Sequence, residues 1–262
     1  MKAFSVVLVL SALAPNAYAT PLVLGPTLDT FAVLGGSAVT NTGSSTIVGN
    51  LGVSPGTAVT GFPPGSVTGG TIHVNDGVAI TAQSQLTTAY TTAATDSPTV
   101  NLTGMDLGGL TLAPGIYHFD SSAQLTGVLT LNAMGDPNAQ FIFQIGSTLT
   151  TASGSSVSII NGGSGNDAFW QVGSSATLGT TTSFEGNILA LTSITLNTGA
   201  NIVCGRALAR NGAVTLDTNQ VSISNCSETT SVPEPGTASL LSVGLGMLLF
   251  GWCARRRAAQ AA

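Results

Sequence analysis

The sequence predicts a mainly β fold: an irregular β-solenoid with one long α-helix packed alongside, followed by a separate C-terminal transmembrane helix. Short runs that alternate apolar and hydroxyl residues recur through the second half of the chain. A loose period of roughly 20 residues is typical of a solenoid, in which each coil buries its apolar side against the next. Hydrophobic residues make up 43% of the chain, which favours an ordered protein although only 6% of residues are charged. A β-sandwich is the structural alternative.

The repetition is irregular. Its four stretches begin at Gln144, Gln171, Leu189 and Leu208, so the first interval is clearly longer than the other two. Each has small residues at a corner, a short alternating strand, a Gly/Thr/Asn turn and a further strand. The alternating strands are 147–150, 176–178, 194–196 and 214–216. Because alternation is the signal of a half-buried strand, several short strands are predicted in each coil.

One segment departs from the β pattern and predicts a helix over about residues 73–94. Its apolar residues recur at spacings of three and four, which makes one apolar helical face. Asn75 or Asp76 can cap its start. We expect this helix to lie along the solenoid and cover one of its sides. The apolar positions are Val74, Val78, Ala82, Leu86, Ala89, Tyr90 and Ala93.

The N-terminal residues 1–19 predict a signal peptide. Lys2 gives a positive start, residues 4–14 are an apolar core, and Ala17-Tyr18-Ala19 offers a small-x-small cleavage site. Signal peptidase is therefore an expected partner, and the mature chain is expected to begin near Thr20. The solenoid domain is predicted to cover residues 20–227.

Residues 228–262 predict a sorting tail. The tetrad Val232, Pro233, Glu234 and Pro235 precedes an uncharged run over 237–254, and an arginine cluster follows at 255–257. The run is near the lower length limit for a membrane-spanning helix, and the arginines are expected on the cytoplasmic side. Motif, span and basic cluster in this order resemble the PEP-CTERM sorting tail of Gram-negative bacteria. That resemblance implies a membrane-bound exosortase that cleaves near the tetrad. An ordinary C-terminal anchor is the alternative.

The two ends together predict an exported protein of a Gram-negative bacterium. The tail would hold an intermediate in the inner membrane, and the processed chain would reach the cell surface or extracellular matrix. Contact with the membrane is expected only through the tail.

The charge balance excludes one class of partner. Residues 20–231 contain ten acidic residues and only two cations, Arg206 and Arg210, a formal net charge of −8. A chain this acidic does not hold a phosphate backbone electrostatically, so no nucleic-acid partner is expected.

Cysteine use fits an oxidising compartment. Cys253 lies in the tail, and the separation of Cys204 from Cys226 is close to the length of one coil. Adjacent strands lie about 4.8 Å apart, inside the usual disulfide Cα range of roughly 4.4–6.8 Å. The sequence predicts a Cys204–Cys226 disulfide, with two free thiols as the alternative.

No catalytic residue, metal ligand or cofactor site is predicted. His73 and His118 stand apart, without a Cys/His/Asp cluster at ligand spacing, and there is no Gly-x-Ser-x-Gly elbow. The carboxylates are scattered, whereas glycoside hydrolysis usually needs a facing pair. A carbohydrate-active solenoid enzyme is therefore a weak hypothesis, and we expect a protein that is not an enzyme.

The abundant side-chain chemistry is hydroxyl and methyl. Short Thr/Ser/Ala/Gly/Asn tetrads stand at comparable points of several coils, and stacking would repeat them every ~4.8 Å. β-Branched threonine is stiff, so such a lattice would be rigid before it meets a ligand. A rigid, uncharged array can order water in register, which predicts a face that docks on ice; plain strand and turn preferences are the alternative. The predicted site residues are Thr57, Thr60, Ser153, Ser155, Thr180, Thr182, Thr198, Asn201 and Thr218.

Long stretches of the chain resemble the bacterial and microbial ice-binding-like family. They are FAVLGGSAVTNTGSSTIVGNLGVSPGTAVTGFPPGSVTGGTIH from Phe31, LTLAPGIYHFDSSAQLTGVLTLNAMGDPNAQFIFQIGSTLTTASGSSV from Leu110, FWQVGSSATLGTTTSFEGNILALTSITL from Phe169 and RALARNGAVTLDTN from Arg206. The resemblance covers roughly residues 28–221. It implies a right-handed, discontinuous β-solenoid with a long helix alongside.

The same resemblance implies adsorption to ice through one flat solenoid face, often with a Thr-Ala/Gly-x-Thr/Asn pattern. Residues 57–60 and 198–201 match that pattern, and the other tetrads depart from it. We therefore expect an exported, non-catalytic ice-binding protein whose partner is the ice crystal surface. The alternative is a structural or adhesive surface protein on the same fold, retained by exopolysaccharide and without ice activity.

Overall fold

The computed structural model describes residues 21–224 and 226. The chain divides into two units, Met1–Ser227 and Glu228–Ala262, and every described residue belongs to the first. The predicted signal peptide, the Val-Pro-Glu-Pro tetrad and the predicted transmembrane helix lie outside the described residues. Within the described part, none of the helices has the length and hydropathy that crossing a bilayer requires.

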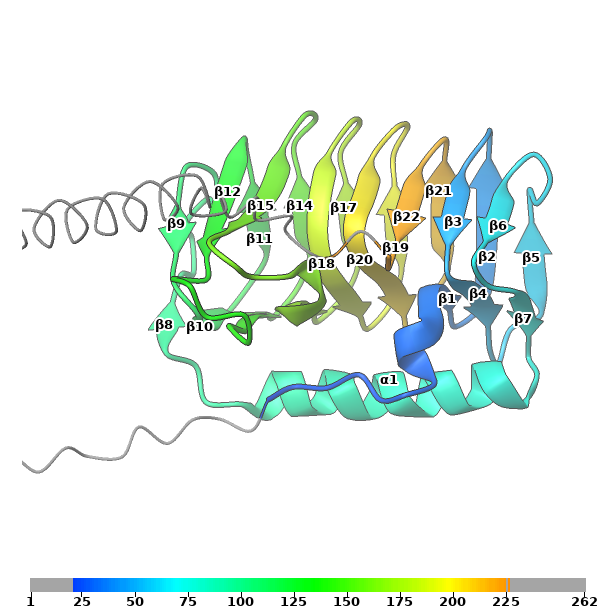
Figure 1. The fold of residues 1–262 in the computed structure, drawn as a ribbon, viewed down its shortest axis with the longest axis horizontal. Helices are drawn as coiled ribbons and strands as arrows, with labels where there is room; N and C mark the ends of the chain where they lie inside the picture. Colours follow the sequence, from blue (N-terminus) through cyan, green and yellow to red (C-terminus); the bar gives the residue numbers. More distant parts are fainter. Residues whose placement is uncertain (1–20, 225, 227–262) are drawn as a thin grey trace, which may run out of the picture. The chain divides into compact units, whose positions relative to one another are not determined.

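The described chain is a stack of β coils with three faces (Figure 1). One face is a separate seven-stranded sheet. The other two belong to one 15-stranded sheet, because two long strands bend from one face to the next. The seven-stranded sheet has the order β11 (Ala123–Leu125), β14 (Leu149–Thr151), β17 (Ala176–Leu178), β19 (Ile194–Leu196), β21 (Val214–Asp217), β2 (Ala38–Thr42) and β5 (Ala58–Thr60).

The larger sheet supplies a helix-covered face and a third, uncovered face. The helix-covered face runs through β8 (Val100–Asn101), β10 (Gly115–Phe119), β13 (Phe141–Ile145), β16 (Ala168–Val172), the second halves of β18 (Ser183–Ala190) and β20 (Asn201–Ala209), β1 (Phe31–Gly35), β4 (Asn50–Val53) and β7 (Ile72–Val74). The third face runs through β9 (Thr111–Leu112), β12 (Val128–Asn132), β15 (Ser156–Ile160), the first halves of β18 and β20, β22 (Gln220–Ser222), β3 (Thr46–Val48) and β6 (Ser66–Thr68).

The stacking order departs from the chain order. The first coil, β1 to β3, pairs in parallel with β20 to β22 on one side and with β4 to β6 on the other. The helix α1 (Gly77–Thr95) then runs along the stack to β8 at the opposite end (Figure 1). The N-terminal and C-terminal coils are therefore neighbours, and the middle of the sequence forms the far end.

The helix begins later than the sequence predicted. It starts at Gly77 because the Asp76 carboxylate accepts hydrogen bonds from the backbone N–H groups of Val78 and Ala79, at 3.0 and 2.9 Å. Residues 72–74 form the edge strand β7 instead. Val74 and Val78, which the spacing placed on the apolar face, are exposed. The buried face consists of Ala79, Ala82, Leu86, Ala89, Tyr90 and Ala93.

Polar side chains fasten α1 to the sheet. The Gln144 amide donates to the carbonyls of Ala93 and Asp96, at 2.8 and 2.6 Å, which satisfies the end of the helix. Gln83 donates to the Ala209 carbonyl at 3.1 Å. This face is therefore closed to large partners.

The interior of the stack is apolar and aromatic. Tyr117, Phe143 and Trp170 stack on successive coils, with ring centroids 5.3 and 3.9 Å apart. Phe184, on the third-face strand of the same coil as Trp170, packs against it with the ring centroids 5.0 Å apart. Cys204 and Cys226 form the predicted disulfide, with Cα atoms 4.8 Å apart, and fasten the last described residue to β20. A packed core and a covalent clasp make the solenoid a rigid support for its outer surfaces.

Candidate functional site

The outer surface of the seven-stranded sheet carries an unbroken row of threonines. Strand register places each of them beside the next on adjacent strands. Their neighbours along each strand point inward; Ile194 and Leu196, which flank Thr195, are 0% and 1% exposed. The row, which we call the threonine row, consists of Thr150, Thr177, Thr195, Thr215, Thr40 and Thr60, with Gln124 extending it at one end.

A second row of small side chains lies parallel to the first, two positions earlier on each strand. None of its members is buried. We call it the small row; it consists of Ser122, Thr148, Ser175, Ser193, Ala213, Ala38 and Ala58. Neither row contains a charged side chain, so the two rows present hydroxyl and methyl groups alone apart from Gln124.

The spacing of the threonine row is set by the backbone. Adjacent strands lie about 4.8 Å apart, and each threonine has few rotamers, so the row is ordered before any ligand arrives. Thr40 donates a hydrogen bond to the Thr215 hydroxyl at 3.4 Å, which joins the N-terminal and C-terminal coils on this surface. The surface can offer a flat, regular and weakly polar array to a solid partner.

Of the nine residues that the sequence predicted for the site, Thr60 lies in the threonine row and Thr57 directly precedes β5. The other seven lie at the corner between the seven-stranded sheet and the third face, where Asn201 begins β20. They are Ser153, Ser155, Thr180, Thr182, Thr198, Asn201 and Thr218.

Two of these corner residues are turned inward. Ser155 and Thr182 are 1% and 0% exposed. Ser155 donates to the Leu125 carbonyl at 3.0 Å, and the Thr182 hydroxyl lies 2.8 Å from that of Thr151. These hydroxyls tie neighbouring coils together and do not reach the surface.

The exposed corner residues form a ridge beside the sheet: Ser153, Thr180, Thr198 and Thr218. Thr198 donates to the Asp217 carboxylate at 2.5 Å. These residues therefore flank the seven-stranded sheet and do not belong to its strands.

The threonine row was visible in the sequence. Its central members stand between two apolar residues in the strands 176–178, 194–196 and 214–216. Alternation alone places such a threonine outward. The prediction instead took the Thr/Ser/Ala/Gly/Asn tetrads that recur at comparable points of several coils, two of which also match the family pattern.

The third face is polar but less uniform. Its outward residues include Val128, Asn201, Gln220 and the carboxylate residue Glu185. A mixture of long, charged and apolar side chains is a poorer lattice than the threonine row.

The two histidines have local partners. His73 Nδ1 lies 2.8 Å from Asp76 Oδ2, and His118 Nε2 lies 3.1 Å from Asp120 Oδ1. The backbone N–H of Ala79, followed by the His73 side chain, lowers the pKa of Asp76. Among residues 21–224 and 226, no three His, Cys, Asp or Glu side chains gather as metal ligands.

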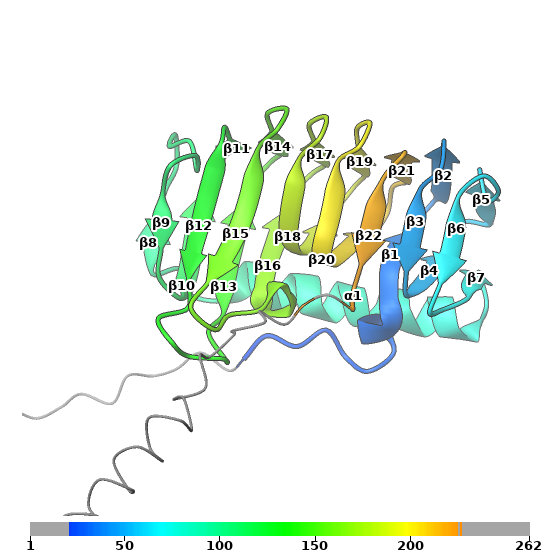
Figure 2. The same cartoon turned by 45° about the horizontal axis from the view of Figure 1, so that its top comes forward.

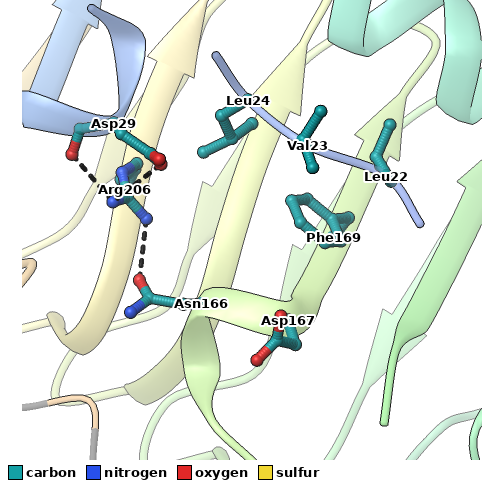
Figure 3. Close-up of a pocket in the computed structure, with 8 residues that line it drawn as sticks. All are labelled: Leu22, Val23, Leu24, Asp29, Asn166, Asp167, Phe169 and Arg206. Atoms are coloured by element: carbon teal, nitrogen blue, oxygen red, sulfur yellow. Dashed lines mark hydrogen bonds and ion pairs between the residues drawn. The ribbon is translucent and has the colours of Figure 1, made fainter. Parts of the chain in front are cut away.

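A pocket of about 380 Å³ lies beside the N-terminal segment (Figure 3). Arg206, 4% exposed, fills one side of it and donates to Asn166 Oδ1, Asn187 Oδ1 and the Asp29 carbonyl, each at 2.8 Å. Burial lowers the pKa of Arg206, and the Asp29 carboxylate at 3.3 Å opposes that shift. The terminal guanidinium nitrogens are thus occupied by the protein itself.

Asp167 also lines this pocket and points away from Arg206 in Figure 3. Burial raises the pKa of Asp167, and a hydrogen bond with Gln140 opposes the rise. Asp167 and Arg206 therefore belong to separate polar networks, and the carboxylate that pairs with Arg206 is that of Asp29.

A parallel β-solenoid with one helix-covered face and one face that carries two uncharged rows of hydroxyl and methyl side chains has the architecture of a surface-binding protein. The chain belongs to the ice-binding-like family, whose model matches residues 33–222. The PEP-CTERM protein-sorting motif matches residues 231–257. Both resemblances found in the sequence are confirmed.

Known relatives agree in sequence and in structure. The chain is 59% identical over 235 residues to an ice-binding protein of Nostoc sp. (strain HG1), covering 88% of this chain and 87% of the relative. A crystal structure of an ice binding protein from an Antarctic biological consortium has a TM-score of 0.74 and 50% identity, over 78% of this chain and 91% of the other. The crystal structure of the ice-binding protein from Antarctomyces psychrotrophicus has a TM-score of 0.74 and 41% identity, over 78% of this chain and 98% of the other.

Proposed function

We propose that this chain binds ice through the seven-stranded sheet and performs no catalysis. The observation that carries the proposal is the threonine row, which crosses six adjacent strands without interruption. Membership of the ice-binding-like family supports it.

The physical case rests on order and on charge. Stiff threonines at the spacing of β-strands hold hydroxyl and methyl groups in fixed places, so adsorption costs little side-chain entropy. Charged groups would draw water into ion shells, and neither row contains one. An extended crystal surface can contact many such groups at once, although each contact is weak.

The test is inhibition of ice recrystallisation by residues 20–231. These residues include every described strand and the helix with their own core, so they can be produced without the tail. Thr195→Tyr places a large ring in the middle of the threonine row, and Thr130→Tyr places the same ring on the third face as the matched control. We expect Thr195→Tyr to abolish activity and Thr130→Tyr to leave it near the parent level. Equal loss in both folded variants would refute the assignment of the face.

We further propose export and processing by signal peptidase and exosortase. The sorting motif at 231–257 supports the exosortase step, and delivery to the cell surface or matrix follows from it. The signal peptide 1–19, the domain bounds 20–227, the span 237–254 and the right-handed winding stay predictions. Mass spectrometry of the mature chain tests the two cleavages, which we expect near Thr20 and near the tetrad Val232–Pro235.

A structural or adhesive role in the surface matrix is the second candidate, supported by the sorting motif. It predicts a folded domain without ice activity that stays with the exopolysaccharide fraction. Activity of residues 20–231 in the recrystallisation assay would set ice binding ahead of this role.

A further inference from the structure

Both ends of the described chain leave the solenoid along one edge, where the helix-covered face meets the third face. At the N-terminal end, Leu22 donates to Gln140 Oε1 and accepts from Gln140 Nε2, each at 2.9 Å. Gln140 directly precedes β13 on this edge. The N-terminal segment (blue) follows the edge in Figure 2, away from β14, β17 and β19.

The C-terminal exit lies on the same edge. Cys226 is bonded to Cys204, which stands where β20 turns from the third face to the helix-covered face. The short 3-10 helix η2 (Gly165–Asp167), which connects β15 to β16 at this edge, packs Gly165 against the Cys204 side chain. We call this line the exit edge.

The exit edge is opposite the seven-stranded sheet. In a coil with three faces, the corner between two faces points away from the remaining face. A five-residue strand such as β15 is about 17 Å long, so the exit edge lies more than ~10 Å behind the threonine row. The disulfide holds the exit there by fastening Cys226 to the last complete coil.

The chain beyond the exit is short. Residues 227–231 separate Cys226 from the tetrad that begins at Val232. Five residues span at most about 18 Å, roughly the width of one face. A surface attached beyond them reaches the corner of the seven-stranded sheet only when these residues are fully extended along a whole face, and every shorter arrangement leaves the threonine row uncovered.

We propose that a molecule attached through its C-terminus turns its threonine row away from the attachment surface, so that it adsorbs ice while still attached. This inference rests on the proposed function. It deepens that function by making the C-terminal exit an orienting device for surface display: the support would contact the exit edge, and ice would contact the opposite face.

The test compares attachment points on residues 20–231. One sample carries a single biotin at its C-terminus, a second carries biotin on Ala38→Cys in the small row, and a third carries it on Thr87→Cys, an exposed position of α1. Each is captured at equal density on streptavidin beads, and the fraction of beads retained by slowly growing ice is measured. Recrystallisation assays of the parent and of the unbiotinylated variants before capture report the ice activity itself.

We expect C-terminal and Thr87→Cys beads to be retained, and Ala38→Cys beads to fall at least about tenfold, because attachment there forbids engagement of the face. Retention of C-terminal beads no better than that of Ala38→Cys beads, with the free domain active, would overturn the inference. Inactivity of the free folded parent domain would overturn the proposed function and this inference with it.

A second measurement tests orientation without ice. The C-terminally captured domain is labelled with a maleimide-linked polymer at Ala38→Cys or at Val23→Cys, which lies at the exit edge and is 73% exposed. We expect capture to slow labelling at position 23 and to leave the rate at position 38 unchanged. Equal slowing at both positions would contradict the proposed orientation.

Discussion

Thr40 and Thr215 lie side by side on the seven-stranded sheet, with their hydroxyl oxygens 3.4 Å apart, although 175 positions separate them in the chain. The pairing of β2 with β21 brings them together. The threonine row is thus completed by the N-terminal coil, and without that coil it would end at Thr215.

The position of a substitution within the threonine row should determine its effect on ice activity. Thr195 has row members on both sides, whereas Thr60 lies on the edge strand β5. A tyrosine ring at the centre of the row keeps a flat partner from contacting threonines on both sides of it, whereas a ring at the end blocks contact on one side only. We expect Thr195→Tyr to reduce recrystallisation inhibition more than Thr60→Tyr; the opposite order would place the contact elsewhere.

Thr182→Val should lower stability without lowering ice activity per folded molecule. Thr182 is 0% exposed, and its hydroxyl pairs with that of Thr151 at 2.8 Å. Valine keeps the volume but removes a buried hydrogen-bond partner, which costs about 1–3 kcal/mol. Urea unfolding measures the loss of stability. Inhibition of ice recrystallisation, assayed far below the temperature at which the variant unfolds, measures the ice activity per folded molecule. A specific loss of ice activity in the folded variant would give this corner a direct role.

Arg206→Met should be strongly destabilising. Arg206 donates to Asn166, Asn187 and the Asp29 carbonyl, and its removal leaves the buried Asn187 Oδ1 without this donor. Breaking a buried charged network typically costs roughly 3–5 kcal/mol. The control is Arg210→Met, which removes a cation 4.6 Å from the Tyr90 ring centroid and should cost less, about 1 kcal/mol. Equal urea midpoints for the two variants would contradict this ranking.

Asp167 and Asp76 should give pH effects of opposite sign. Burial raises the pKa of Asp167, so the folded state binds its proton more readily than the unfolded state does. Ionised Asp167 therefore destabilises the fold above its folded pKa, and the penalty disappears as the pH falls below the unfolded pKa. We expect Asp167→Asn to be more stable than the parent near pH 7, with the difference shrinking toward about pH 4 and below.

Asp76 is the matched contrast. The Ala79 N–H, followed by His73, lowers its pKa, so its stabilising contribution is present above the ordinary aspartate value of 3.8 and lost as the pH falls through the folded pKa. Asp76→Asn should therefore be less stable than the parent near neutral pH, and the two should converge in acid. Melting temperatures of both variants and of the parent, measured from acid to neutral pH, check the two predictions. If both substitutions stabilise the protein near pH 7, or both destabilise it, the opposite pKa shifts of the two carboxyls are refuted.

Local pattern was sufficient for several strands of the second half of the chain and for the existence of the helix. Alternation of threonine with apolar residues indicated the short strands around Thr177 and Thr195, and spacings of three and four indicated the helix. The helix start was displaced because Asp76 caps it, and a single side-chain hydrogen bond decides such a boundary. The disulfide followed from the coil length, since the separation of Cys204 from Cys226 returns the chain to an adjacent strand.

The sequence by itself determined the class of fold, the family, the disulfide pair and the sorting motif, because each depends on residues close together or on a long ordered match. Only the tertiary structure decided which threonines share a surface. That depends on register between coils such as β2 and β21, which no local spacing encodes. It also turned Ser155 and Thr182 inward, and it set the exit edge opposite the threonine row, because both depend on how the whole coil closes around its core.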